Sequence, residues 1–239
     1  MIYIFIFLLL VLGFFIIKYS FLIPEKKGIP VLMYHKIDEY QITINELIGF
    51  LENKTTLPQN PVLITFDDGY VNNLTLAYPL LKKYQMKATI FLPTAYLGGM
   101  SSWYDGGAML MTYEQLKLMD TGVIEFGLHS HKHPNFKHLS IEQMREEMLT
   151  NQQILAQNGI TYTPAFAYPY GGRPKKKEAS QAMKKMFAEI GIKAAFRIGN
   201  KVNSFKPKDV YELKRIDIQG NDSFWAFKTK LKKGRVKLL

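Results

Sequence analysis

The sequence predicts an α/β fold with a parallel sheet of about seven strands, preceded by a transmembrane helix. Short apolar runs recur along the chain, and amphipathic stretches with helix-start signals lie between most of them. An uninterrupted apolar run at the N-terminus predicts the membrane helix. The periodicity fits an open doubly wound sheet and a closed barrel equally well, so it does not choose between them.

The N-terminal run extends from Ile2 to Ile17 and resumes at Phe21 to Ile23. Twenty-odd helical residues reach roughly 30 Å, which is the thickness of a bilayer core. No small-residue cleavage site follows the run. We therefore expect residues 1–24 to form an uncleaved membrane anchor.

The orientation of this anchor is open. Lys18, Lys26 and Lys27 follow the apolar residues, and the positive-inside rule then favours a cytoplasmic C-terminal domain. The function argued below favours an extracellular domain instead, so the two expectations conflict.

The strands are predicted from the apolar runs in the order in which they occur. They cover residues 30–35, 61–66, 87–92, 123–127, 164–168, 193–198 and 212–218. Because strands alternate with helices, they are expected to pair in parallel within one domain, residues 28–220.

Three helices are expected to begin at capping boxes. These boxes are Thr43 with Glu46, Thr112 with Gln115, and Ser140 with Gln143. The Ser140 helix should extend to Asn158, because Gly159 is a typical C-terminal stop. Further helices are predicted over residues 72–84 and 175–190.

Composition excludes several classes of site. The 239 residues contain no cysteine, so any metal must be held by His, Asp or Glu. The net charge of +11 is concentrated in Pro174–Glu178 and Lys228–Lys237. We interpret these as a solvated helix start and as part of a frayed basic tail, residues 221–239. Attraction to anionic envelope polymers or a membrane is the alternative, and no pattern favours nucleic acid.

The strongest chemical motif is ITFDDGY, in which a strand ends at Asp67, Asp68 and Gly69. Neighbouring side chains of a strand face opposite sides, so both carboxylates share one site only if the chain turns there. Gly69 permits such a turn. The alternative is a simple turn with two hydrated carboxylates.

A second motif, GLHSHKHP, also follows a predicted strand and contains three of the five histidines. His129 and His133 are four positions apart, so one helical turn would place both beside a metal and direct His131 elsewhere. Two histidines and one aspartate form a three-ligand set that leaves positions open for water and substrate. The alternative is an exposed polar loop.

The third motif, AFAYPYGG, ends a strand in a rigid loop that could present Tyr170 at a pocket and aim a backbone N–H at an oxyanion. A loop shaped only for folding is equally compatible with this segment.

In this order and at these separations, the motifs resemble the polysaccharide deacetylases, the NodB-homology enzymes of carbohydrate esterase family 4. The resemblance implies a distorted (β/α) barrel and metal-dependent removal of acetyl groups from N-acetylglucosamine units of a polymer. It implies Asp67 as the general base, with Asp68, His129 and His133 as ligands of a divalent metal. The backbone N–H of Tyr170 would stabilise the oxyanion. Zinc suits this ligand set, and cobalt, nickel or manganese are alternatives.

The sequence departs from the family pattern in two places. Many members have an arginine before the proline of the third motif, and this chain has none there. Arg215 and Arg197 are candidates to orient the base, and a surface position is more expected for Arg197. Most members also have a late Leu-x-x-His motif carrying the general acid, whereas the last histidine here is His138.

The form Leu-x-x-His occurs instead at the front of the domain, in Leu32–His35. If the first strand lies beside the last, His35 can occupy the same place in a barrel. Poly-N-acetylglucosamine deacetylases of biofilms resemble this layout, so His35 is the expected general acid.

The predicted function is therefore a membrane-anchored N-deacetylase of an N-acetylated exopolysaccharide or cell-wall glycan. One alternative is a non-catalytic glycan-binding module of the same fold, motivated by the missing arginine and the basic tail. Another is an intracellular metallohydrolase of a small amide, motivated by the charges beside the anchor.

Overall fold

The structure is a computed structural model that describes residue 28 and residues 30–33, 41–103 and 107–235. The strands are β1 (Val31–Met33), β2 (Gln41–Ile42), β3 (Val62–Asp67), β4 (Ala88–Leu92), β5 (Ile124–Leu128), β6 (Ala165–Ala167), β7 (Ala194–Ile198) and β8 (Leu213–Asp217). The α-helices are α2 (Ile44–Leu51), α3 (Tyr78–Lys83), α4 (Tyr113–Lys117), α5 (Ile141–Gln157), α6 (Lys177–Glu189) and α7 (Phe224–Lys233). Short helical turns are η1 (Asn73–Ala77), η2 (Phe136–His138) and η3 (Pro169–Gly171).

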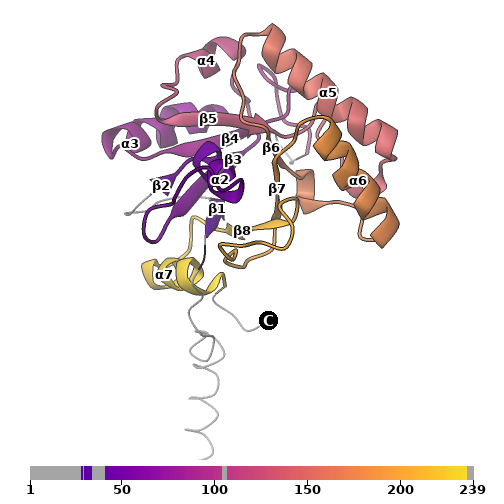
Figure 1. The fold of residues 1–239 in the computed structure, drawn as a ribbon. Helices are drawn as coiled ribbons and strands as arrows, with labels where there is room; N and C mark the ends of the chain where they lie inside the picture. Colours follow the sequence, from indigo (N-terminus) through magenta and orange to yellow (C-terminus); the bar gives the residue numbers. More distant parts are fainter. Residues whose placement is uncertain (1–27, 29, 34–40, 104–106, 236–239) are drawn as a thin grey trace, which may run out of the picture.

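All seven predicted strands are present, and the short strand β2 is additional. They pair in parallel in the order β1-β8-β7-β6-β5-β4-β3-β2, and β1 also pairs with β3. Leu32 is opposite Ile64 of β3 and Ile216 of β8. The sheet therefore curls on itself with helices around it, as Figure 1 shows. This arrangement fits a distorted (β/α) barrel better than an open doubly wound sheet.

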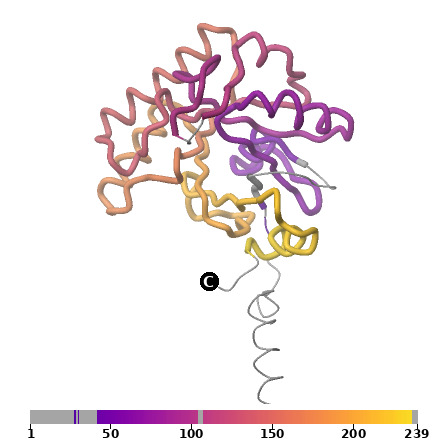
Figure 2. Tube along the Cα trace, turned by 180° about the vertical axis from the view of Figure 1, so that it is seen from behind, coloured from indigo at the N-terminus to yellow at the C-terminus, as the bar shows by residue number. Residues whose placement is uncertain are grey.

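The pairing of β1 with β8 brings the two ends of the domain together. Figure 2 shows the indigo N-terminal strands beside the yellow C-terminal elements. The first predicted strand therefore lies next to the last one, as the displaced Leu-x-x-His motif requires.

The three predicted capping boxes are confirmed. The side chains of Thr43, Thr112 and Ser140 each accept a hydrogen bond from the backbone N–H three positions later, and the reciprocal bond is present. Helix α5 ends at the cap residue Asn158, and Gly159 follows with a φ of 70°. Because these signals act within one helical turn, the sequence is sufficient to place them.

The helix predicted over residues 72–84 is present, as the π-helical turn η1 followed without a break by α3. One helical expectation needs correction. The expected frayed tail contains helix α7, which is capped by the Ser223 side chain. Phe227 and Leu231 are one turn apart on α7 and pack against the main core. This amphipathic spacing explains why the basic segment is helical.

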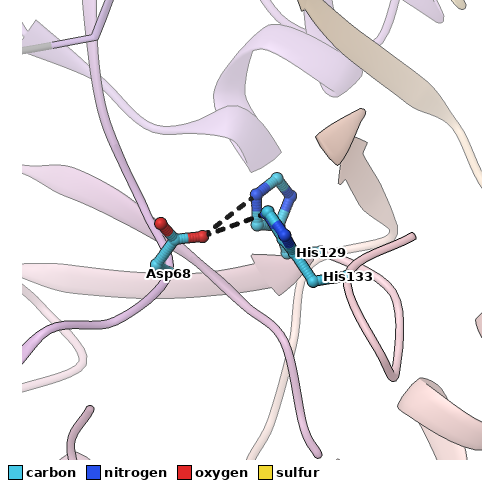
Figure 3. A group of neighbouring side chains, drawn as sticks. All are labelled: Asp68, His129 and His133. Carbon is cyan, nitrogen blue, oxygen red and sulfur yellow. Dashed lines mark ion pairs between the residues drawn. The ribbon is translucent and has the colours of Figure 1, made fainter. Parts of the chain in front are cut away.

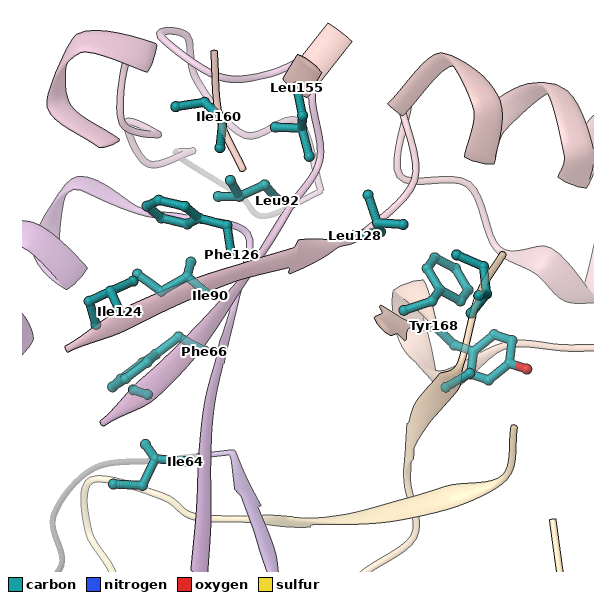
Figure 4. Close-up of a cluster of buried hydrophobic side chains, with 14 of the residues drawn as sticks. Ile64, Phe66, Ile90, Leu92, Ile124, Phe126, Leu128, Leu155, Ile160 and Tyr168 are labelled. Carbon is teal, nitrogen blue, oxygen red and sulfur yellow. The ribbon is translucent and has the colours of Figure 1, made fainter. Parts of the chain in front are cut away.

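Alternate residues of each strand pack into different clusters, because side chains of a strand point to opposite faces. Ile64, Phe66, Ile90 and Leu92 belong to the large cluster that the outer helices cover (Figure 4). The intervening residues, such as Leu63 and Phe91 together with Phe196 and Leu213 of later strands, form a second cluster.

No helix in the described part of the chain is both long and apolar enough to cross a membrane. The predicted anchor of residues 1–24 lies outside the described residues.

Candidate metal centre and active site

The two aspartates of the first motif lie at the carboxyl end of β3, where the backbone turns sharply. Asp67 has the same strand parity as Leu63, which places its side chain toward the inside of the curled sheet. In a regular strand Asp68 would face the opposite side. Instead Asp68 and Gly69 both have a φ of 73°, so this left-handed turn lets both carboxylates serve one site.

His129 follows β5 and is buried. Its Nδ1 lies 2.7 Å from the carbonyl oxygen of Ala167. Because a carbonyl oxygen only accepts, Nδ1 carries a proton, and in the neutral ring Nε2 has the free lone pair. This Nε2 faces Oδ1 of Asp68 at 3.4 Å.

His133 faces the same oxygen, but the backbone between His129 and His133 is not the helical turn that the sequence predicted. The segment from His129 to His133 is a non-helical loop, in which Ser130 and His133 have φ values of 67° and 54°. These left-handed positions fold the loop back, so that Nε2 of His133 also lies 3.4 Å from Oδ1 of Asp68. His131 points elsewhere as expected, with its Nδ1 3.0 Å from the Thr94 hydroxyl.

The three side chains form a buried cluster whose candidate ligand atoms all lie within 4.8 Å of one another (Figure 3). Atoms bound at about 2.1 Å to one tetrahedral ion lie about 3.4 Å apart. The two separations of 3.4 Å between Asp68 and the histidines match this value. Oδ1 of Asp68 is buried and has no hydrogen-bond partner among the described residues. The donor set and this unsatisfied oxygen therefore fit a divalent metal ion.

The local environment shifts the pKa values of His133, His129 and Asp67 in different directions. Burial, together with the nearby His129, lowers the pKa of His133 to about 3, so His133 is neutral at physiological pH. Burial also lowers the pKa of His129, but the charges of Asp67 and Asp68 outweigh it and raise that pKa overall. Burial alone would raise the pKa of Asp67, yet the charge of Arg215 lowers it. Asp67 is therefore ionised and able to accept a proton.

Arg215 is the arginine that pairs with Asp67. It lies on β8, is 1% exposed, and donates from Nη1 and Nη2 to the two carboxylate oxygens of Asp67 at 2.5 and 2.6 Å. Such a two-point contact fixes the plane of the carboxylate. Arg197 instead pairs with Glu212 at 2.6 Å, away from Asp67.

The third motif forms the turn η3 directly after β6, beside the metal cluster. Tyr170 has a φ of 57°, and its ring centroid lies 4.8 Å from that of His133 in an edge-on contact. The side chain of Tyr170 is 57% exposed, so it forms an open wall of the site. A Cβ at Gly172 would meet Oδ1 of the Asn135 side chain at 1.8 Å, so a larger residue there would displace that side chain.

The sequence interpretation missed the residues that hold the histidine loop. The Glu147 carboxylate of α5 accepts the backbone N–H groups of His131 and Lys132 at 2.9 and 2.7 Å. One turn further along α5, Asn151 donates to the Leu92 carbonyl and the Thr94 hydroxyl. Spacing along the helix shows only that Glu147 and Asn151 share a face, not which loop they contact.

Trp103 is another residue of the site that the sequence motifs did not indicate. Its indole N–H lies 3.1 Å from Oδ2 of Asp68, and its ring stacks on His133. Trp103 stands in a segment without a recognisable motif, 35 positions from Asp68. No signal in the sequence connects the two.

His35 lies outside the described residues, so its position relative to this site stays a prediction. The strand that precedes it, β1, is placed between β3 and β8, which carry Asp67 and Arg215.

Chemically, the site combines three buried side chains that could hold a metal ion with an ionised carboxylate held by an arginine. This is the set required to activate water and to polarise a carbonyl group. It is also open to solvent at Tyr170.

Two solved structures share the fold of this chain. The Streptococcus pyogenes deacetylase PplD, solved in complex with acetate, superposes with a TM-score of 0.71 at 23% identity and covers 86% of this chain and 98% of that one. IcaB from Ammonifex degensii gives a TM-score of 0.64 at 21% identity, covering 87% and 97%. At these identities the likeness concerns the fold.

Sequence similarity establishes the family. The chain is 32% identical over 191 residues to the poly-β-1,6-N-acetyl-D-glucosamine N-deacetylase of Staphylococcus epidermidis, a match that covers 77% of this chain and 62% of that protein. The chain spans less than two thirds of the length of the curated relatives that it matches first. A sequence model of the family described as polysaccharide deacetylase matches residues 54–191, which is more than half of the chain. The chain belongs to the polysaccharide deacetylase family.

Proposed function

We propose that this protein is a metal-dependent hydrolase that removes N-acetyl groups from a polysaccharide containing N-acetylglucosamine. The observation that carries the proposal is the buried cluster of Asp68, His129 and His133 beside the Asp67–Arg215 pair. The names of the staphylococcal relatives favour a poly-N-acetylglucosamine substrate. A cell-wall glycan is the other glycan class to be tested.

Asp68, His129 and His133 would hold the metal ion, for which two nitrogen ligands and one oxygen ligand favour zinc over cobalt, nickel or manganese. When bound, such an ion lowers the pKa of water and polarises the carbonyl oxygen of the acetamide.

Proton transfer in the proposed reaction is assigned to Asp67 and His35. Asp67 accepts a proton from the attacking water, whose oxygen forms a bond to the acetyl carbon. Arg215 keeps Asp67 ionised and fixes its orientation. The backbone N–H of Tyr170 would donate to the oxygen on which negative charge develops. His35 would give a proton to the sugar nitrogen as the C–N bond breaks, so that acetate and a free amine leave. Each acid–base group is expected to contribute about 10²–10⁴-fold in rate.

The location and domain limits belong to the same proposal. Residues 1–24 would anchor the protein in a membrane, and residues 28–220, against which α7 packs, would form an extracellular catalytic domain. The basic side chains of residues 221–239 would contact anionic envelope polymers. Protease treatment of intact cells would test the side of the membrane. Degradation of the domain is the expected result, whereas full protection would place it inside the cell.

The proposal is tested by measuring acetate release from poly-N-acetylglucosamine, chitin oligomers and peptidoglycan, with and without chelator. We expect the full chain to release acetate, the chelator to abolish release, and added metal to restore it. Asp67→Asn should remove activity while the bound metal remains, whereas His129→Ala should lose both. His35→Ala with near-normal turnover would contradict the assignment of the acid.

A metal-loaded chain that releases no acetate from any of these glycans would favour a non-catalytic glycan-binding module. The missing arginine was the main reason for that alternative. Because Arg215 now pairs with Asp67, no specific observation favours it.

A further inference from the structure

Trp103 covers the metal cluster and contacts two of its three members. Its Nε1 lies 3.1 Å from Oδ2 of Asp68 and 3.0 Å from the hydroxyl of Tyr70. Its ring lies nearly parallel to the His133 imidazole, with centroids 4.1 Å apart and planes 24° from parallel. One side chain therefore contacts the oxygen ligand and a nitrogen ligand of the cluster.

The hydrogen bond to Asp68 has a directional consequence. The terminal torsion of a carboxylate is soft, so an aspartate left alone can rotate its two oxygens freely. The indole N–H only donates, and it binds Oδ2. The opposite oxygen, Oδ1, is then directed at the Nε2 atoms of His129 and His133. The indole N–H, which Oδ2 shares with the Tyr70 hydroxyl, thus favours Oδ1 as the oxygen that faces the metal position.

The stacked ring has a second consequence, for His133. The indole covers one face of the imidazole, and the Tyr170 ring meets it edge-on at 4.8 Å between centroids. The indole is in turn held by Tyr96, whose ring is perpendicular to it at 4.8 Å. His133 is left 6% exposed, so its side chain has little freedom to turn away from Asp68.

We propose that Trp103 is a positioning residue for the metal centre, which orients Asp68 through its N–H and His133 through its ring before the ion binds. This inference rests on the proposed metal site. It adds a role for a residue that lies outside the three motifs. Preorganised ligands lose less freedom on binding, so affinity for the ion should depend on Trp103.

The competing explanation is that Trp103 only fills space over the site. Trp103→Phe separates the two, because phenylalanine keeps an aromatic ring over His133 but has no N–H for Asp68. Affinity for Zn²⁺ is measured on the full chain by competition with a chromogenic chelator. We expect Trp103→Phe to weaken Zn²⁺ binding about 10–100-fold, which is the usual effect of losing a partner of a metal ligand. Affinity equal to that of the unaltered chain would overturn the inference.

A second variant keeps the test valid if Trp103→Phe does not fold. Tyr96→Leu removes the edge contact that holds the indole and leaves Asp68 and His133 untouched. Its Zn²⁺ affinity should fall in the same direction and by a smaller factor. The absorption spectrum of the Co²⁺ form should also shift in both variants, because ligand geometry sets that spectrum. Unchanged affinity and an unchanged spectrum would contradict the inference.

The chain contains only two tryptophans, which provides a direct probe of proximity. Trp225 is on α7, and Trp225→Phe leaves Trp103 as the sole tryptophan and serves as the matched control. Titration with Co²⁺ should quench the fluorescence of this variant to saturation, with affinity equal to that of the unaltered chain. Absence of quenching while Co²⁺ binds would overturn the placement of Trp103.

These outcomes are independent of the proposed activity. If Trp103→Phe loses affinity but no glycan releases acetate, the positioning role stands and the deacetylase proposal fails. If the unaltered chain releases acetate and Trp103→Phe binds Zn²⁺ normally, only the positioning role fails.

Discussion

Arg215 is a charged side chain buried inside the curled sheet, and its surroundings explain how it is tolerated there. Both oxygens of Asp67 accept from its guanidinium, Nη1 also lies 3.4 Å from the Thr65 hydroxyl, and the charge sits 5.6 Å from the centre of the Phe91 ring. Removing two charges from water costs free energy that such a pair only partly recovers. The pair is therefore better explained by orientation of Asp67 than by stability.

We predict that Arg215→Lys lowers the rate of acetate release about 10²-fold, because lysine is a point charge and cannot hold both oxygens of Asp67. Metal content should stay unchanged, since Asp68, His129 and His133 are untouched. The matched control is Arg197→Lys, whose ion pair with Glu212 lies away from Asp67. Wild-type turnover in Arg215→Lys would show that the two-point contact is not needed.

Ser130 lies between the two histidines of the candidate metal cluster, and it is buried in an unusual backbone conformation. It is fully buried with a φ of 67°, and its hydroxyl has no hydrogen-bond partner among the described residues. A left-handed conformation costs about 1–2 kcal/mol for a residue with a Cβ.

We predict that Ser130→Gly is more stable than Ser130→Ala by about 1 kcal/mol in urea unfolding of the metal-free chain. Both variants remove the hydroxyl, so their difference reports the preference for positive φ after the opposing effects of the buried Cβ and of glycine's freedom in the unfolded chain. Equal stability of the two would mean that the loop relaxes to a right-handed conformation.

At the scale of elements, helix α5 positions the histidine loop. Its capping box begins the helix at Ser140, and the face carrying Glu147 and Asn151 contacts the loop and the end of β4. Between His129 and His133 the loop has no regular secondary structure, and it is held by these side-chain contacts together with the backbone bond from the Ala95 N–H to the His131 carbonyl at 2.9 Å.

We predict that Glu147→Ala weakens Zn²⁺ binding about tenfold, because two loop N–H groups lose their acceptor and the histidine ligands become less ordered. Chelator competition measures the change. Glu146→Ala is the control, since Glu146 is the exposed neighbour on the same helix. Identical affinities for the two variants would contradict this role of α5.

At the scale of the whole molecule, β1 joins β8 to β3. A strand of only three residues thereby covers one edge of each neighbour. Unpaired edges of a sheet expose backbone donors and acceptors and promote aggregation.

We predict that a chain begun at Gln41 aggregates or fails to fold, whereas a chain begun at Gly28 folds without aggregating. The difference between them includes β1. Size-exclusion chromatography and circular dichroism of the two chains measure the effect. Equal folding of both would show that the β1 pairings contribute little.

The local features of this protein can be predicted from its sequence alone. Strand positions follow from apolar runs, helix starts from the Thr43, Thr112 and Ser140 boxes, and the turn after Asp67 from Gly69. The histidine and aspartate motifs follow strands, and the ends of parallel strands meet at one edge of a sheet. The resemblance to the polysaccharide deacetylases then distinguished Asp68 as a metal ligand from Asp67 as the base. Each of these signals acts within a few residues, so the linear sequence contains it in full.

Contacts between residues that are distant in the sequence became visible only in the folded chain. Arg215 lies 148 positions from Asp67 and Trp103 lies 35 from Asp68, and nothing in the local pattern links either pair. His129 and His133 converge through left-handed loop positions that the helical spacing did not predict. Such contacts depend on strand register and on the closure of the sheet through β1, which are set by the packing of the whole chain.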